Sequence, residues 1–371
     1  MNVNVDLIGA GGRAQGSVAN EFLAQGRTDV GTMRPWLGDD GRPYVMVYSG
    51  KGDAKDPKNY QVMPINTNAT LRRDEWKTLD DALMLAARQR LGGAQDLIDN
   101  GLVYNLGNAM GTTVLEWHDV SDSMEADLTM DGVTRSIGDR PKFQHNYLPI
   151  PIIHVDYEIN ARILEASRKL GNPLDTTSAE QAARRCLEKL EDMFFTNTSY
   201  AFGETDSRTR HSIYSYLSHP DRNQITLSSQ PGGAWDNSSK TAAQIVDDVR
   251  DMKQSSINDR FYGPWMLYIP TAYETILDAD YAVDTPGTTI RERILKIDGI
   301  KGVKVVDRLT ADNVLLVQMT SNVVRLVQGM GLQNVEWQTE GKFVTKYKVM
   351  TIQVPQIRSD QNGRTGIVHM A

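Results

Sequence analysis

The sequence predicts an α+β protein with more than one compact part. At 371 residues the chain exceeds the length at which a single hydrophobic core usually stops growing. Apolar residues recur with helical spacing in some segments and with period two in others. Because the two kinds of segment mix without strict alternation, an α+β arrangement is favoured over a doubly wound parallel sheet.

The N-terminal part predicts an extended arm and then a helix. Residues 1–70 are rich in Gly, Asp, Asn and Pro and contain one clear apolar run at 44–48, so we expect one strand and no core of their own. From Asp74 onward apolar residues follow helical spacing until Gly92 and Gly93 end the run. This segment is the first expected helix.

Residues 112–154 predict a long two-stranded ribbon. Apolar and polar residues alternate from 124 to 130, a turn is expected at Asp131 and Gly132, and apolar residues return between 148 and 154. Two prolines on the opposite phase indicate an edge or a free-standing ribbon, because proline cannot donate to a sheet ladder. Such a ribbon is barely stable alone and should lie on another surface.

Two helices are expected next. Residues 156–170 predict a short helix, and Thr177 with Glu180 forms a capping box at the start of a second one. The second helix is strongly amphipathic and should be the backbone helix of the subunit, with the lone cysteine as a core thiol. Its apolar face carries Ala179, Ala182, Ala183, Cys186, Leu187, Leu190, Met193 and Phe194.

The C-terminal half predicts a polar loop and then a mixed domain. Residues 197–240 are polar and are expected to form a long loop. Helices are then expected at 242–253, 273–277 and 290–297, and strands at 265–269, 303–306, 314–319, 323–327, 342–354 and 367–369.

Composition excludes several classes of protein. A formal net charge of −7 argues against a protein whose main task is to neutralise phosphates. A single cysteine permits no intrachain disulfide. No apolar run approaches a membrane span and the N-terminus lacks a signal-like block, so we expect a soluble cytosolic protein without membrane partners.

The order of these elements resembles the HK97-type shell proteins, in particular the major capsid proteins of tailed bacteriophages. The matching segments are residues 31–36, 40–44, 71–76 with 79–82, and 149–154 leading into 156–159. The resemblance covers nearly all of the chain from about Gly31 onward.

This resemblance implies an α+β fold of HK97 type and a division of the chain into named parts. They are an N-terminal arm at 1–73, an N-terminal helix with the start of the peripheral domain at 74–110, an extended β-hairpin loop at 111–155, a peripheral domain with the spine helix and following loop at 156–240, an axial domain at 241–330, and C-terminal peripheral strands at 331–371.

The implied function is structural, without catalytic, cofactor-binding or metal-binding residues. The subunit is expected to form hexamers and pentamers of an icosahedral head that encloses double-stranded DNA, with portal and scaffolding or decoration proteins as further partners. It would be found in the virion capsid and, during assembly, in the host cytoplasm. Contacts between subunits are expected at Trp117, Met124, Leu128, Met130 and Lys142 of the extended loop.

Some HK97-type proteins cross-link a hairpin lysine to an asparagine of a neighbour. Lys142 is the only lysine between Thr112 and His154. Such a bond also requires a partner asparagine and a carboxylate in a dry pocket, so the sequence leaves a cross-link at Lys142 open.

Residues 173–177, Ala182 with Ala183, and Glu191 with Asp192 also resemble the encapsulins, shells of the same fold that sequester cargo enzymes. The long arm departs from encapsulins, so the phage interpretation is favoured and the encapsulin-like compartment is the alternative.

Three weaker patterns in the sequence could indicate a catalytic, cofactor-binding or metal-binding site. Residues 9–14 satisfy a loose G-x-G-x-x-A pattern, but the glycines and proline that follow do not suit a dinucleotide-binding unit. The six histidines show no metal-ligand spacing, and surface positions are expected for them. Glu191 and Asp192 are adjacent on a helix and point to different sides, so an interface or solvent is expected for this pair.

Overall fold

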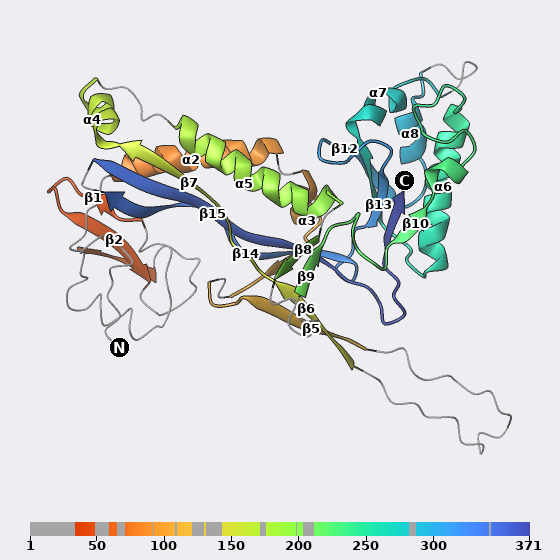
Figure 1. Cartoon of the computed structure of the whole chain (residues 1–371), viewed down its shortest axis with the longest axis horizontal. Coiled ribbons are helices and arrows are strands. Elements are labelled where there is room, and N and C mark those ends of the chain that lie inside the picture. The colour runs from red at the N-terminus through yellow and green to blue at the C-terminus, as the bar shows by residue number, and fades with distance from the viewer. Residues whose placement is uncertain are drawn as a thin grey trace.

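The computed structural model describes residues 34–48, 59–64, 71–90, 92–107, 110–120, 130, 143–170, 176–197, 199–202, 211–281, 287–340 and 343–371. Figure 1 shows a long twisted sheet with helices along one side, a second lobe coloured green to blue that contains the C-terminus, and a ribbon that leads away from the body.

The long sheet has the order β4-β14-β15-β7, formed by Val103–Asn105, Val324–Glu340, Val344–Ile357 and Ile153–Asn160. β14 and β15 are antiparallel, and Val324 opposite Ile357 and Glu340 opposite Val344 mark the two ends of their pairing. The helices α2 (Arg73–Arg90) and α5 (Thr177–Phe195) cover one face of this sheet (Figure 1).

α5 confirms the expected backbone helix. Its apolar positions recur three and four residues apart, which places them on one face, and Leu187, Leu190 and Phe194 are at most 1% exposed. Cys186 is a buried thiol whose Sγ lies 3.6 Å from the Val349 carbonyl oxygen, and burial raises its pKa to about 12. The expected core thiol is confirmed.

The start of α5 differs from the expected capping box. The N-cap is Thr176, one residue earlier than Thr177, and its backbone is helical rather than extended. Its hydroxyl donates to Glu180 Oε1 at 2.7 Å instead of accepting from the first-turn amides. The helical conformation at Thr176 turns the side chain away from those amides, so the box does not form.

The N-terminal segment forms a small sheet of three strands, β1 (Trp36–Leu37), β2 (Pro43–Tyr48) and β3 (Tyr60–Pro64). Only β2 was expected, because the other two are very short or carry polar residues. The sheet is tied to α2, since Arg34 pairs with Asp80 at 2.7 Å and Trp76 Nε1 donates to the Pro35 carbonyl at 3.0 Å.

The second lobe contains a five-stranded sheet in the order β10-β16-β13-β11-β12, formed by Asn223–Ile225, Ile367–Met370, Val314–Gln318, Trp265–Pro270 and Ile300–Val306. Met266 and Tyr268 of β11 join the core of the larger body, whereas Leu267 and Ile269 pack in a second core with helices α6 (Ala242–Asn258), α7 (Glu274–Leu277) and α8 (Ile290–Leu295). Burial of both faces explains why β11 is continuously apolar.

Three expectations about the middle and end of the chain were wrong. First, residues 153–160 form strand β7, so the helix expected from residue 156 begins only at α4 (Ala161–Leu170). The reason is that Val155, Tyr157 and Ile159 alternate with polar residues and pair with β15. The expected loop 197–240 contains β8 (Ser199–Phe202), β9 (His211–Tyr214), β10 and the 3-10 turn Leu227–Ser229. The closing strand β16 lies in the second lobe and not with the other C-terminal strands.

β14 is also much longer than the strand expected at 323–327. The alternating pattern of a strand is hidden in the sequence, because the second half of β14 carries polar residues and its pairing shifts register between Gln328 and Gln333.

None of the described helices is long and apolar enough to cross a membrane.

Candidate functional site

The ribbon is the first candidate site. β5 (Val114–Val120) and β6 (Phe143–Pro149) pair antiparallel, with Leu115 opposite Leu148 and Trp117 opposite Asn146. This pairing confirms the base of the expected ribbon, which ends at Pro149 rather than continuing to His154. Residues 121–129 and 131–142 lie outside the described part of the chain.

One face of the ribbon base is attached to the body. Leu148 is 4% exposed and belongs to the larger core, and Leu115 and Trp117 pack against it. Asp119 accepts a hydrogen bond from the Asn146 amide and pairs with Arg358 at 3.5 Å, just beyond the end of β15. These contacts set the direction in which the ribbon leaves the body.

The other face exposes aromatic rings. Phe143 is 63% exposed and Tyr147 is 38% exposed. The ring centroids of Tyr147 and of His211 on β9 are 4.7 Å apart. Beside them a shallow apolar cavity of about 300 Å³ opens between the ribbon and the β8–β9 pair. Its walls are formed by Thr113, Val114, Pro149, Ile150, Pro151, Phe202 and His211. Exposed apolar surface of this kind is typical of a contact with another molecule.

The expected contact residues fall into three groups. Trp117 lies half-buried on the attached face, and within the described residues its Nε1 has no hydrogen-bond partner. Met130 is fully exposed. Met124, Leu128 and Lys142 lie outside the described residues, as does the glycine pattern at 9–14.

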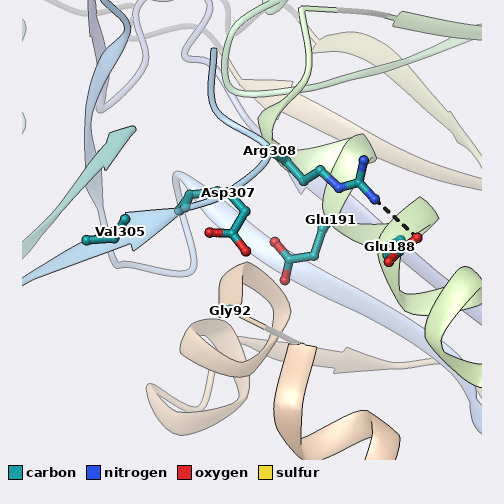
Figure 2. A pocket seen from close by; sticks show the side chains of 7 residues that line it. Gly92, Glu188, Glu191, Val305, Asp307 and Arg308 are labelled. Atoms are coloured by element: carbon teal, nitrogen blue, oxygen red, sulfur yellow. Dashed lines mark ion pairs between the residues drawn. The ribbon is translucent and has the colours of Figure 1, made fainter. Parts of the chain in front are cut away.

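A second candidate site is a polar cavity of about 450 Å³ between α5, the first turn of α3 (Gly92–Asp99) and the end of β12. Figure 2 shows Glu191 and Asp307 with their carboxyl groups turned toward each other and Arg308 turned toward Glu188. Arg308 pairs with Glu188 at 3.3 Å and with Asp192 at 3.5 Å.

Glu191 corrects the expectation of an interface or solvent position. It is 7% exposed, and Oε1 accepts a hydrogen bond from the backbone N–H of Gly93 at 2.9 Å. Burial raises the pKa of Glu191 to about 7, and the charge of Asp96 acts in the same direction. The local sequence gave no sign of this, because the segments that bury Glu191 lie far from it in the chain.

Two of the histidines are buried, although surface positions were expected for them. His219 and His369 are buried, and burial lowers the pKa of each to about 4. His369 Nδ1 accepts a hydrogen bond from Arg222 at 3.3 Å, and Nε2 lies 2.7 Å from Asn313 Oδ1. His118 and His145 face each other across the ribbon with ring centroids 4.3 Å apart. In the described part of the chain no three potential metal ligands form a cluster.

Comparison with known proteins bears on the fold. No curated protein matches the sequence. Among solved structures, the virus-like particle from Pyrococcus furiosus aligns with 80% of this chain and 99% of its own at 18% identity and a TM-score of 0.56. The capsid of Myoviridae phage XM1 aligns with 74% of this chain and 90% of its own at 10% identity and a TM-score of 0.54. The expected HK97-type α+β fold is thereby confirmed.

A family model matches residues 66–370, a span that includes α2, the ribbon, α5 and both large sheets. The chain therefore belongs to the family described as "Family of unknown function (DUF6260)".

Proposed function

We propose that this protein is the subunit of a closed protein shell, and specifically the major capsid protein of the icosahedral head of a tailed double-stranded DNA bacteriophage. The observation that carries the proposal is the ribbon, whose base is attached to the body on one face and exposes aromatic rings on the other. The fold shared with solved shell structures supports the same function.

The body of the subunit does not need the ribbon's exposed residues for its own stability. Two hydrophobic cores are already formed by α2, α5 and the long sheet, and by α6 with the five-stranded sheet. Extended segments that leave the body can cover a neighbour and so bury the area that a specific interface requires. We therefore propose contacts between copies at Trp117, Met124, Leu128, Met130 and Lys142, within an extended loop at 111–155.

The test is to purify the full chain and to follow its assembly by light scattering and electron microscopy. Closed particles, or hexamers and pentamers, are expected. The double variant Met130→Glu with Phe143→Glu places two charges on exposed apolar positions and should prevent regular particles. His145→Glu adds a charge to the same exposed face of the ribbon without removing an aliphatic side chain or Phe143, and should assemble normally. A well-folded monomer of the wild type at high concentration would contradict the proposal.

The alternative is an encapsulin-like compartment that holds cargo enzymes. The observation that favours it is the alignment with nearly the whole chain of the Pyrococcus furiosus virus-like particle. Double-stranded DNA within purified particles, together with associated portal and scaffolding or decoration proteins, would support the phage head. A co-purifying enzyme within DNA-free particles would support the compartment.

A further inference from the structure

The cavity in Figure 2 lies where the two hydrophobic cores adjoin. α5 comes from the larger body, the first turn of α3 lies against it, and β12 belongs to the five-stranded sheet. Val306 is part of the larger core, whereas Val305 packs against the smaller one. A change in this cavity therefore acts on the junction between the two parts of the subunit.

Tight backbone packing holds Glu191 in this junction. A Cβ at Gly93 would lie 2.6 Å from the Phe195 ring, so only glycine allows α3 to approach α5 so closely. The close approach brings the Gly93 amide within 2.9 Å of Glu191 Oε1. The carboxyl group is consequently fixed with its free side toward Asp307 (Figure 2).

Negative charge dominates the surroundings of Glu191. Arg308 is engaged by Glu188 and Asp192, and Asp96 on α3 accepts from the Tyr268 hydroxyl at 2.8 Å and from Lys304. The Gly92 and Gly93 amides and Arg308 favour the ionised form, but burial and Asp96 outweigh them and raise the pKa of Glu191. The charged or titratable groups around it are Glu188 and Asp192 on α5, Asp96 on α3, Lys304 on β12, Asp307 and Arg308 after it, Tyr268 on β11, and Tyr216.

We propose that this junction is a proton-dependent latch, closed while Glu191 is neutral and loosened when Glu191 ionises. A neutral Glu191 adds no charge to the buried junction and keeps its hydrogen bond from the Gly93 amide. An ionised Glu191 adds a buried charge that Asp96 repels, and opening the junction to water relieves both the burial of that charge and the repulsion. The latch involves contacts within one chain, so it does not rest on the proposed shell function.

The direction of the pH effect follows from the pKa values. The pKa of Glu191 is about 7 in the closed junction, against 4.5 for the ordinary carboxyl. The closed state is therefore most stable at low pH, and opening increases as the pH rises from 4.5 toward 7 and then levels off. Each unit of difference in pKa changes the equilibrium tenfold, so an increase on the order of 10- to 100-fold is expected between pH 5 and 7.

Hydrogen exchange of the full chain measures this opening directly. Peptides from Gly92–Asp99 and Ile300–Val306 should exchange faster between pH 5 and 7, after correction for the intrinsic rate, while peptides from α6 provide an internal reference. Glu191→Gln cannot ionise and should remove the increase. Glu180→Gln removes an exposed carboxylate near the start of the same helix, away from the cavity, and should retain the increase.

Several results would overturn the latch. They are a wild type whose exchange at these peptides does not change between pH 5 and 7, a Glu191→Gln variant that keeps the increase, or a Glu180→Gln variant that loses it. If Glu191→Gln does not fold, Asp96→Asn provides the second test. Removing that charge lowers the pKa of Glu191, so exchange should level off at a lower pH; an unchanged profile would reject the proposal. None of these outcomes bears on whether the chain forms shells.

Discussion

Helix α5 and the ribbon differ in how far their apolar side chains are exposed to solvent. α5 places Leu187, Leu190 and Phe194 in the core at no more than 1% exposure, whereas the ribbon leaves Phe143 63% exposed and the described Met130 fully exposed. Both segments have regular periodic patterns, so pattern alone does not reveal whether an apolar face is buried by its own chain. The difference suggests that one part of the molecule serves folding and the other serves association.

The largest expected effect is on the spine helix. Leu190→Asp places an unpaired charge at a position that is 0% exposed, and such changes cost several kcal/mol, about 3 to 5. We expect the variant to be insoluble or unfolded, as judged by circular dichroism and urea unfolding. Gln181→Asp introduces the same side chain at an exposed position of α5 and should leave the free energy of unfolding within about 0.5 kcal/mol of wild type. A soluble and stable Leu190→Asp protein would show that the helix is not the core element described here.

The sequence predicts α5 correctly and β7 incorrectly for the same physical reason. Ten residues of α5 are buried along one helical face, so its period was visible in the sequence. Residues 156–160 alternate as a strand, but they are followed directly by the helical pattern of α4, so the local spacing does not mark where the strand ends. The strand is fixed by pairing with β15, which lies far away in the chain, as the pair Tyr157 and Tyr347 shows. Local spacing contains no information on that partner.

The second prediction concerns the two buried histidines of the body. His219 and His369 have pKa values of about 4 in the folded protein against an ordinary 6.5, so the unfolded state binds more protons between these values. Stability should therefore be complete above pH 6.5 and fall as the pH decreases toward 4, by about 2 to 3 kcal/mol for each histidine. Urea unfolding at several pH values measures this slope.

Variants of these two histidines test the assignment. His219→Gln with His369→Gln should flatten the slope between pH 6.5 and 4, whatever its effect on stability at pH 7.5. Each single variant should remove about half of the slope, because burial lowers the two pKa values to the same extent. A double variant that keeps the full slope would contradict the assignment.

The smallest expected effect is at Trp117. Its Nε1 is buried and has no partner within the described residues, so the indole contributes packing area but also an unsatisfied donor. Trp117→Phe removes the donor and part of the area, and we expect a change in the free energy of unfolding of less than about 1 kcal/mol. Urea unfolding measures this change. A larger loss of stability would contradict the prediction, because it would indicate that the Trp117 indole makes a hydrogen bond.

The candidate sites show the same limit of sequence reasoning as β7. The ribbon could be predicted because its strands are close in sequence and their alternation is regular. The burial of Glu191 could not, since it depends on Gly93 and on residues 305–308, which lie far from it in the chain. The burial of His369 likewise depends on the pairing of β16 with β10 and β13.

One paired measurement tests most directly whether the ribbon serves association and the body serves folding. Residues 124–137 are deleted from the ribbon, beyond the described ends of β5 and β6. Urea unfolding and circular dichroism then report the fold, and electron microscopy reports particles. We predict a free energy of unfolding within about 1 kcal/mol of wild type and a failure to form regular particles. Normal particles, or a large loss of helical signal with the deletion, would contradict this division of roles.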